Sequence, residues 1–365
     1  MKHILWGLLF VVVLATGCSN EGSNNARDIE DKPVSDPRFV PELIAEELQI
    51  PWSIDEENCI FYLSERPGHI VTIENGKINR QQVILEKTLS NASEAGLLGF
   101  VLAPDFSNSK EAFAYYTYED SSGQFNRIVV LKQENNAWKE TKILLDKIPS
   151  GHVHHGGRLK IGPDGKLYAT TGDASKEPEI AQDLASLGGK ILRMNLGGSI
   201  PSDNPLPNSY VYSYGHRNPQ GLVWATDGTL YESEHGPSAN DEINIIKPGF
   251  NYGWPAIKGK EKRDGMEMAI FTSGEDTTWA PSGMAVYNGK LYVATLRGNA
   301  VREFNVETGE TREVITGLGR IRDVMIKDDS LYFISNNTDG RGTPLEGDDK
   351  LYRVPLSNFE KKMSN

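Results

Sequence analysis

Cysteine is scarce in this 365-residue chain, which contains only Cys18 and Cys59. The chain also lacks any run of basic residues, and its net charge is −12. Because phosphate binding needs clustered lysine and arginine, these features exclude a nucleic-acid partner. Helical periodicity is almost absent from the body of the chain, which favours an all-β fold.

The first 18 residues are typical of a lipoprotein signal peptide. Lys2 precedes an apolar run from Ile4 to Ala15, which is too short to span a bilayer as a permanent helix. The sequence ATGC at 15–18 resembles a bacterial lipobox, although leucine is the usual residue at its first position. It predicts an exported protein that is lipidated on Cys18 and anchored to the outer face of the cytoplasmic membrane, or a periplasmic protein. Ordinary secretion with a free cysteine is the alternative.

Residues 19–37 are polar, lack a hydrophobic period and are predicted to form a flexible tether. Beyond them only Cys59 remains, and a lone cysteine in an exported domain cannot form an internal disulfide. Its context ENCIFYLSE is apolar and strand-like, so we expect Cys59 to be a small buried side chain.

One phrase recurs six times along the body of the chain: a short apolar run, a turn at Asp-Gly or an equivalent, and a second strand that carries an aromatic residue. The second strands are marked by Phe61, Ala114 (in the degenerate copy), Tyr168, Tyr231, Tyr292 and Tyr332. Blades of β-propellers recur at roughly 40–50 residues, with insertions in loops. The repeats therefore predict a six-bladed β-propeller over residues 38–358, followed by a polar tail at 359–365. A large β-sandwich is the alternative, but it is not expected to repeat one phrase at blade-sized intervals.

Equivalent loops of a propeller meet at one mouth of the central channel, so polar residues at equivalent repeat positions should converge there. The positions that precede three of the marker strands hold His154, Arg217 and Arg320, and Arg322 follows two residues later. The loops after marker strands carry Asp173, the run Glu234-His235-Gly236-Pro237, and Arg297. Such a cluster of cations is electrostatically costly unless it meets a polyanionic ligand. We therefore expect an anion-binding mouth.

The stretch GHVHHGGRL at 151–159 places three histidines in four positions. On an extended segment, His152 and His154 face one side and His155 faces the other. A zinc site is one interpretation, but only two ligands are visible where four are usual. A solvated loop is another. We favour His154 as a general base, with His152 and His155 as supporting or surface residues.

Several longer stretches resemble a single family. They are GLLGFVLAPDF (96–106), HHGGRLKIGPDGKLYATTGD (154–173), GGKILRMNLGGSIPSDNP (188–205), YGHRNPQGL (214–222), SEHGPSANDEINIIKPGFNYGWP (233–255) and GRIRDV (319–324). The chain resembles the soluble quinoprotein sugar dehydrogenases, which comprise the PQQ-dependent glucose dehydrogenase and the shorter aldose sugar dehydrogenases. The resemblance runs from about Pro51 to Val354. It implies the six-bladed propeller that the repeats also predict.

The resemblance implies oxidation of aldose sugars at C1 to lactones, with hydride transfer to PQQ and onward transfer of electrons to an acceptor that the sequence does not name. His154 holds the place of the general base, and Arg217 would stabilise charge on the reacting quinone oxygen. The other implied roles are quinone contacts by Asn218, a place beside the sugar or quinone for Glu94, pairing of the PQQ carboxylates with Arg297, Arg320 and Arg322, and Ca²⁺ binding by the backbone carbonyls of Gly236 and Pro237.

Three positions depart from the pattern of glucose dehydrogenase. Glu94 replaces a glutamine, Arg297 replaces a lysine, and Val153 replaces the aspartate before the base. The chain also lacks the longer loops of glucose dehydrogenase, so the aldose sugar dehydrogenases fit better. Two rival functions stay open: a metal-dependent lactonase, which would need carboxylates and amides around its metal, and a non-catalytic propeller that binds carbohydrate or protein.

Overall fold

The computed structural model describes residues 40–360, and this part of the chain consists almost wholly of β-strands. The predicted signal peptide with Cys18, the tether at 19–37 and the end of the chain from residue 361 lie outside the described residues. The structure is therefore all-β, as the sequence predicts.

The strands form four-stranded antiparallel groups that follow one another along the chain. Four separate sheets contain β10 (Leu159–Ile161), β11 (Leu167–Thr171), β12 (Lys190–Met194) and β13 (Val211–Tyr214); β14 (Pro219–Trp224), β15 (Leu230–Glu234), β16 (Glu242–Ile246) and β17 (Phe271–Thr272); β18 (Pro281–Tyr287), β19 (Lys290–Thr295), β20 (Ala300–Asn305) and β21 (Thr311–Thr316); and β22 (Ile321–Lys327), β23 (Ser330–Ser335), β24 (Leu351–Pro355) and β1 (Glu42–Ala45).

The remaining eight strands form one sheet made of two antiparallel groups. These are β2 (Pro51–Glu57), β3 (Ile60–Glu65), β4 (His69–Glu74) and β5 (Lys77–Ile84), and then β6 (Leu97–Leu102), β7 (Glu111–Asp120), β8 (Gly123–Glu134) and β9 (Ala137–Pro149). The two groups are joined by a short parallel pairing of β5 with β9, at Val83–Trp138 and Ile84–Lys139.

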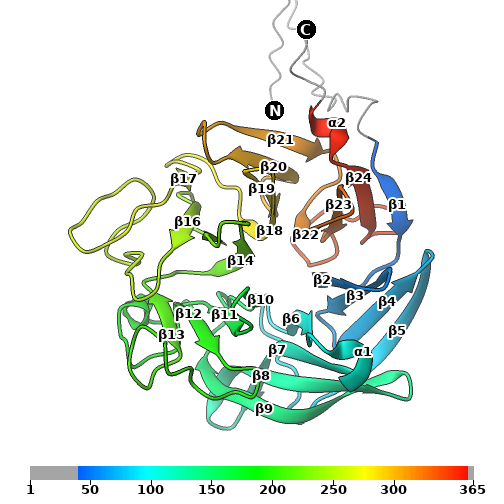
Figure 1. The fold of residues 1–365 in the computed structure, drawn as a ribbon, viewed down its shortest axis with the longest axis horizontal. Helices are drawn as coiled ribbons and strands as arrows, with labels where there is room; N and C mark the ends of the chain where they lie inside the picture. Colours follow the sequence, from blue (N-terminus) through cyan, green and yellow to red (C-terminus); the bar gives the residue numbers. More distant parts are fainter. Residues whose placement is uncertain (1–39, 361–365) are drawn as a thin grey trace, which may run out of the picture. The chain divides into compact units, whose positions relative to one another are not determined.

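The sheets stand around a common axis with their first strands innermost (Figure 1). The inner strands β2, β6, β10, β14, β18 and β22 contact one another in turn, and β22 contacts β2. The marker residues of the repeats all lie in the second strand of a group, from Phe61 in β3 to Tyr332 in β23. This arrangement is that of a propeller.

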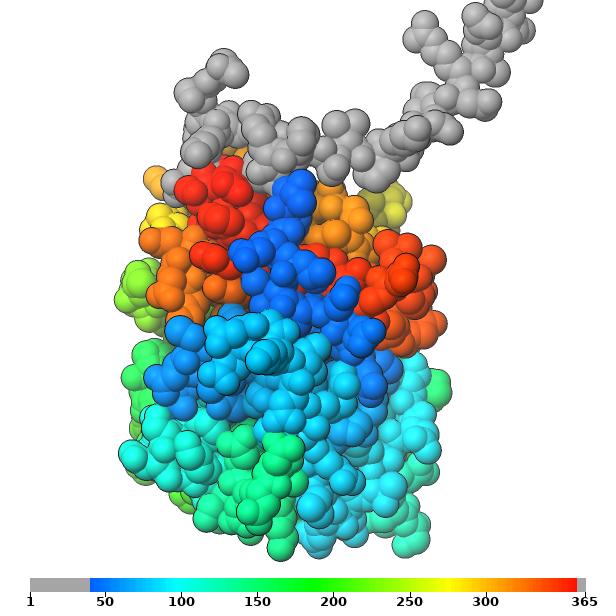
Figure 2. Space-filling model, turned by 90° about the vertical axis from the view of Figure 1, so that its right-hand side faces the viewer, coloured from blue at the N-terminus to red at the C-terminus, as the bar shows by residue number. Residues whose placement is uncertain are grey.

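The start and the end of the described chain meet in one sheet. Strand β1 pairs with β24, with Glu42 opposite Arg353 and Ala45 opposite Leu351. Figure 2 shows the blue start of the chain lying against its red end. The ring is thus closed by hydrogen bonds between its first and last strands.

A buried ion pair ties the sheets together near the axis. The Nη1 of Arg158 lies 2.8 Å from Oδ2 of Asp323, and both side chains are almost fully buried. Arg158 Nε also donates to the carbonyl of Gln220, and the same Asp323 oxygen accepts from the amide of Ile54. The pair therefore links segments of four different sheets, at β2, β10, β14 and β22.

Cys59 corrects one prediction, because its side chain is exposed and not buried. Strand β2 ends at Glu57 and β3 begins at Ile60, so that Asn58 and Cys59 form the turn between them. Both have positive φ, 55° and 64°, as a tight hairpin turn of the mirror-image type requires. The sequence context was strand-like, but the cysteine lies in the turn of the hairpin.

Three short helical segments complete the described chain: α1 (Phe106–Ser109), a 3₁₀ turn (Pro178–Ala181) and α2 (Ser357–Glu360). None of the helices between residues 40 and 360 is long or apolar enough to cross a membrane. Phe359 in α2 is buried, and its carbonyl accepts a hydrogen bond from Arg312. The folded domain therefore reaches at least to Phe359, just past the predicted boundary at 358.

Candidate active site

A cavity of about 840 Å³ opens where the loops of different sheets converge. Eight of the residues predicted for the site line it: Glu94, His154, Arg217, Gly236, Pro237, Arg297, Arg320 and Arg322. Arg322 lies in β22, and the others come from loops beside β6, β10, β14, β15, β19 and β22. The structure therefore brings together residues that are up to 228 positions apart in the sequence, while their individual roles stay predictions.

His154 is held by a carboxylate. Its Nδ1 lies 2.7 Å from Oδ1 of Asp173, whose other oxygen accepts from Nε1 of Trp254 at 2.8 Å. Burial raises the pKa of Asp173, but its hydrogen bonds with His154, Ser175 and Trp254 more than offset this, and the net pKa is lowered. Asp173 is therefore a stable anion that keeps the proton on Nδ1 and leaves the lone pair of Nε2 available. Within residues 40–360 no group forms a hydrogen bond to Nε2.

A glycine makes room for the unusual backbone of His154. The φ of His154 is 64°, in the left-handed region that few residues other than glycine adopt. Its carbonyl oxygen lies so close to Gly172 that a Cβ there would be 2.0 Å away. Gly172 directly follows the strand β11 and precedes Asp173, so the same turn positions both partners of the pair.

The other two histidines of the cluster do not join His154. His155 is buried, and its ring nitrogens contact Oγ of Ser150 and the carbonyl of Ser93 at 2.9 and 3.0 Å. Burial lowers its pKa to about 4, so that it is neutral and braces the loop. His152 is exposed and does not line the cavity. The structure therefore does not assemble the two-histidine metal site that the sequence left open.

The lining of the cavity carries an excess of positive charge. It contains six arginines against three carboxylates, which are Glu94, Asp241 and Asp339. Two of the arginines, Arg66 and Arg341, and the carboxylate Asp339 were not predicted from the sequence. Asp339 accepts from Arg320 at 2.7 Å and lies 3.7 Å from Arg322. One carboxylate thus partly neutralises two buried guanidinium groups.

A second ion pair lies at the rim of the cavity. Arg341 binds Glu94 through Nη1 and Oγ of Ser93 through Nη2, the latter at 2.9 Å. The second oxygen of Glu94 accepts from the backbone amide of His154 at 3.3 Å. Burial raises the pKa of Glu94, but Arg341, and after it His235 and His155, more than offset this and lower the pKa to about 2. Glu94 is therefore a permanent anion beside the histidine.

Two buried nitrogen atoms in the cavity wall have no hydrogen-bond partner. They are Nε of Arg217 and Nε2 of His235. Burial lowers the pKa of His235 to about 4, so the ring is neutral. Its Nδ1 lies 3.4 Å from the amide nitrogen of Asn218, which leaves Nε2 as the protonated nitrogen. Both unpartnered atoms are then donors, which suits an acceptor-rich ligand.

The Gly236-Pro237 turn presents two carbonyl oxygens. No hydrogen bond to either of them occurs between residues 40 and 360. The turn is fixed by Asp241, which accepts from the backbone amides of Gly236 at 2.9 Å and Ala280 at 2.8 Å. Free carbonyl oxygens on a rigid turn are suitable ligands for a hard cation.

Asn218 differs from the other predicted residues. Its side chain is fully buried and is not part of the cavity lining. Its Oδ1 accepts from the amide of Gly156 at 3.1 Å, and its Nδ2 contacts His235. In this structure the side chain supports the loop of His154 and the ring of His235 from behind.

The comparison with known proteins identifies the family. A family model described as Glucose / Sorbosone dehydrogenase matches residues 48–352. The chain belongs to this family. As a glucose/sorbosone dehydrogenase family member it is similar to the aldose sugar dehydrogenase YliI of Escherichia coli, at 30% identity over 82% of this chain and 90% of that protein. Quinoprotein glucose dehydrogenase B of Acinetobacter calcoaceticus is 34% identical over 60% of this chain, and the match spans 52% of its length.

Solved structures of family members share the fold. The PQQ-bound form of aldose sugar dehydrogenase from Streptomyces coelicolor has a TM-score of 0.80 and 34% identity, covering 86% of this chain and 96% of that one. The apo form of the soluble aldose sugar dehydrogenase of Escherichia coli has a TM-score of 0.76 and 28% identity, covering 87% and 99%. Glucose/sorbosone dehydrogenase relatives are thus named as sugar oxidoreductases, and one binds PQQ.

Proposed function

We propose that this protein is a PQQ- and Ca²⁺-dependent aldose dehydrogenase that oxidises the anomeric carbon of sugars to a lactone. The observation that carries the proposal is the pairing of His154 with Asp173 inside a cavity with an excess of arginine. A histidine with a free Nε2 is suited to remove a hydroxyl proton, and the arginines suit an anionic cofactor.

The residues of the cavity fit PQQ. Its three carboxylates would balance the three-charge excess of arginine over acidic residues in the lining. Arg297, Arg320 and Arg322 would hold these carboxylates, and the unpartnered donors of Arg217 and His235 would meet acceptor atoms of the ligand. The carbonyls of Gly236 and Pro237 would bind Ca²⁺. When bound, PQQ supplies the hydride acceptor and Ca²⁺ polarises its quinone carbonyl.

Side chains of the protein would remove the proton of the sugar's anomeric hydroxyl and stabilise the charge that results. Nε2 of His154 accepts it from the anomeric hydroxyl of the sugar as the C1–O bond gains double-bond character. The resulting imidazolium is stabilised by the Asp173 carboxylate, which remains ionised because its pKa is lowered. Trp254 and Ser175 hold that carboxylate in place. The tautomer and the orientation of the base are thus set before the sugar arrives.

Two further parts of the proposal concern the fold and the location. We infer that the eight-stranded sheet counts as two blades, because only two residue pairs join its halves, which gives a propeller of six blades. We also propose export and lipid anchoring at Cys18, with an aldose as substrate and an electron acceptor that is still to be identified. These last points rest on the sequence.

The rival functions are less well supported by the cavity. A metal-dependent lactonase needs several carboxylates or amides directed at a metal, whereas the cavity has twice as many arginines as carboxylates. A binding propeller has no need for the His154–Asp173 pair.

The test is reconstitution of the purified apoprotein with PQQ and Ca²⁺, followed by dye reduction with a panel of aldoses. His154→Ala should lower kcat by about 10²–10⁴-fold while PQQ binding is retained, because general-base catalysis contributes about that much. His152→Ala is the matched control, since His152 is exposed and outside the cavity, and it should leave kcat unchanged.

Two results would contradict the proposal. Failure of the apoprotein to bind PQQ at micromolar concentration would remove the cofactor assignment. If PQQ binds but His152→Ala and not His154→Ala abolishes turnover, the base has been assigned to the wrong histidine.

A further inference from the structure

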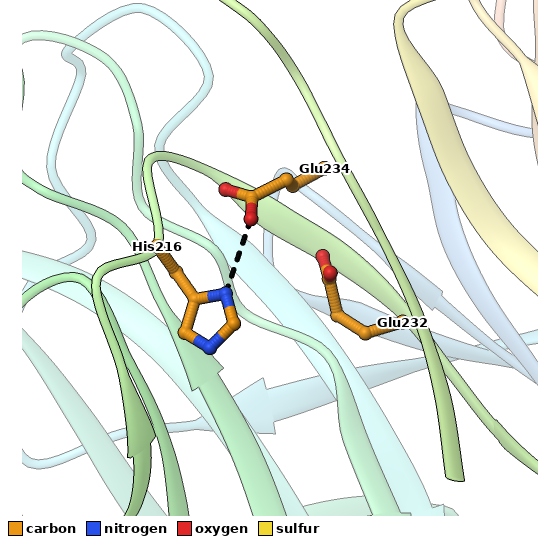
Figure 3. A group of neighbouring side chains, drawn as sticks. All are labelled: His216, Glu232 and Glu234. Carbon is orange, nitrogen blue, oxygen red and sulfur yellow. Dashed lines mark hydrogen bonds and ion pairs between the residues drawn. The ribbon is translucent and has the colours of Figure 1, made fainter. Parts of the chain in front are cut away.

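A second group of titratable side chains lies behind the wall of the cavity. His216, Glu232 and Glu234 point toward one another from β15 and from the segment before β14 (Figure 3). One potential ligand atom from each lies within 4.8 Å of the other two. Their side chains are almost fully buried. None of the three lines the cavity described above.

Negative charge in this group is not balanced by a basic side chain. Asn244 contacts Glu232, Glu234 and Glu242 through the same Nδ2 atom, at 3.1, 3.4 and 3.3 Å. An amide nitrogen has two hydrogens and cannot satisfy three carboxylates fully. Across residues 40–360, no lysine or arginine forms an ion pair with any of the three glutamates. A buried carboxylate without a counter-charge is costly.

One carboxylate oxygen in the group has no partner at all. Glu232 is fully buried, and its Oε1 makes no hydrogen bond in the described structure. Figure 3 shows the carboxylate beside that of Glu234 and the ring of His216. One oxygen of this carboxylate lies within 4.8 Å of ligand atoms of His216 and Glu234, so the unpartnered acceptor suggests that a cation belongs among the three side chains.

We propose that His216, Glu232 and Glu234 bind a divalent transition-metal cation such as Zn²⁺ or Mn²⁺. Ligand atoms of a four-coordinate zinc ion lie about 3.5 Å apart, so three atoms within 4.8 Å need only small movements to reach one ion. An imidazole with two carboxylates gives a nitrogen-containing, charge-neutralising set that favours such metals over Ca²⁺. This site is separate from the Gly236-Pro237 carbonyls and does not depend on the proposed sugar oxidation.

The surroundings of His216 are those of a metal-bound imidazole. Its Nε2 lies 2.9 Å from Oγ of Ser213, and a proton donated to that hydroxyl leaves Nδ1 as the ligand atom. The ring stacks on Tyr252, with centroids 4.8 Å apart and planes 19° from parallel. Nδ1 faces Oε1 of Glu234 at 3.1 Å. The ring is thus oriented by its neighbours, and a bound metal would take the place of the proton between Nδ1 and Glu234.

The ion would stabilise the wall of the cavity from behind. The second oxygen of Glu234, Oε2, accepts from the backbone amide of Arg217 at 2.6 Å. A metal that fixes Glu234 therefore fixes the start of the segment that carries the Arg217 guanidinium. We assign the site a structural role, because the group is closed to solvent.

The test uses the full-length apoprotein without PQQ. Metal content is measured by mass spectrometry, and Zn²⁺, Mn²⁺ and Ca²⁺ are titrated singly after dialysis against a chelator. We expect about one equivalent of Zn²⁺ or Mn²⁺ per chain and a Tm that falls by several degrees on chelation and recovers on metal addition. No bound transition metal together with a Tm insensitive to the chelator overturns the proposal.

Variants distinguish the proposed metal site at His216, Glu232 and Glu234 from the Ca²⁺ site proposed at the Gly236-Pro237 carbonyls. Glu232→Gln removes one ligand charge at constant shape and should weaken metal binding by at least about 10-fold, while Glu74→Gln, at an exposed position on β4, should not. Ca²⁺ bound by the Gly236-Pro237 carbonyls should survive in both.

A second variant covers the case in which Glu232→Gln does not fold. Ser213→Ala removes only the hydroxyl beside Nε2 of His216 and should weaken metal binding by about 10–100-fold. Burial raises the pKa of Glu232, so protons are the competing way to neutralise the group. Two results would show that protons, and not a metal, neutralise the group formed by His216, Glu232 and Glu234. One is an unchanged metal content in Glu232→Gln, and the other is a higher Tm of this variant in a metal-free protein.

Discussion

The arginine-rich cavity lies next to the buried glutamate group formed by His216, Glu232 and Glu234, and the two have opposite charge. The amide of Arg217 donates a hydrogen bond to Glu234, and His216 directly precedes Arg217 in the chain. In the cavity, arginines outnumber carboxylates and the lining is open to a ligand. In the glutamate group, carboxylates stand beside a histidine and an amide, and the atoms are closed to solvent. The cavity has an excess of positive charge and the glutamate group an excess of negative charge. The two do not neutralise each other through an ion pair between the side chains of Arg217 and Glu234.

The difference suggests two kinds of ligand. A cavity that is accessible can exchange its ligand, and it is partly neutralised by Asp339 and Glu94 while it is empty. A closed group exchanges its counter-ion only when the fold opens locally, so the proposed metal should leave and return slowly. Charge excess in a protein interior thus indicates a ligand, and burial indicates whether the ligand is reversible or structural.

Of the variants that distinguish the cavity from the glutamate group, Arg322→Gln should have the largest effect, on the affinity for PQQ. Arg322 is buried and donates to Asn336 and Gln220, which hold its guanidinium at the cavity. Loss of a charge-assisted contact of about 1.5–3 kcal/mol should weaken PQQ binding by roughly 10–100-fold. Fluorescence or calorimetric titration of the apoprotein with PQQ measures this. Metal content of the glutamate group should not change.

Arg263→Gln serves as the control for the lost charge, because Arg263 is exposed and outside the cavity. Equal weakening of PQQ binding in both variants would show that net charge, and not a specific contact, is responsible. A fall in Tm for Arg322→Gln large enough to unfold the protein would be visible in the same samples, and Arg297→Gln, at an exposed lining residue, then replaces it.

Smaller and opposite effects on PQQ affinity should follow from removing either charge of the Glu94–Arg341 ion pair at the rim of the cavity. Glu94→Gln makes the cavity one charge more positive and should tighten PQQ binding by about 2–5-fold, whereas Arg341→Ala should weaken it by a similar factor. Both effects should shrink as salt is raised, because Arg341 is about half exposed. The measurement is PQQ affinity at two ionic strengths.

Arg341→Ala also has a consequence for pH. Arg341 lowers the pKa of Glu94, so its removal should raise that pKa from about 2 toward the ordinary range. The ion pair contributes stability that is present above the pKa of the unfolded carboxyl and is lost as pH falls toward 2. The wild type should therefore lose more stability than Arg341→Ala between pH 5 and pH 3. Identical pH profiles of Tm would refute the pairing.

The smallest effect should come from Cys59→Ser, which lies in neither region. The side chain is exposed in the turn between β2 and β3, and serine tolerates the same backbone as cysteine. Tm, PQQ affinity and metal content should match the wild type within error. A large loss of stability would mean that the original expectation of a buried cysteine was right.

Most of the site could be predicted because its residues hold fixed positions relative to the strands of the sequence repeat. His154 and Arg217 precede the same strand position in neighbouring groups, so their convergence follows from the repeat itself. Asp339 and Arg341 lie in the loop between β23 and β24, where no repeat position fixes their place. Their contacts with Arg320 and Glu94 depend on the path of that loop, which the sequence pattern does not encode.

Residues behind the cavity were harder to predict for another reason. Asn218 is next to Arg217 in sequence, but its side chain is directed away from the cavity, so a motif that lists both cannot tell lining from support. Glu232 and Glu234 are two apart on β15 and share one face of the strand. That spacing was a usable signal for a paired-carboxylate site. The third partner, His216, could be added only from the fold.

The sheet that is closed by the pairing of β1 with β24 also contributes to the anion site. The sheet that β1 completes also contains β22, which carries Arg322 and follows Arg320 directly. Strand β1 lies at the outer edge of this sheet and β22 at its inner edge, with β24 and β23 between them. One sheet thus divides two tasks between its edges: the outer edge joins the first strand of the domain to the last, and the inner edge presents arginines to the cavity.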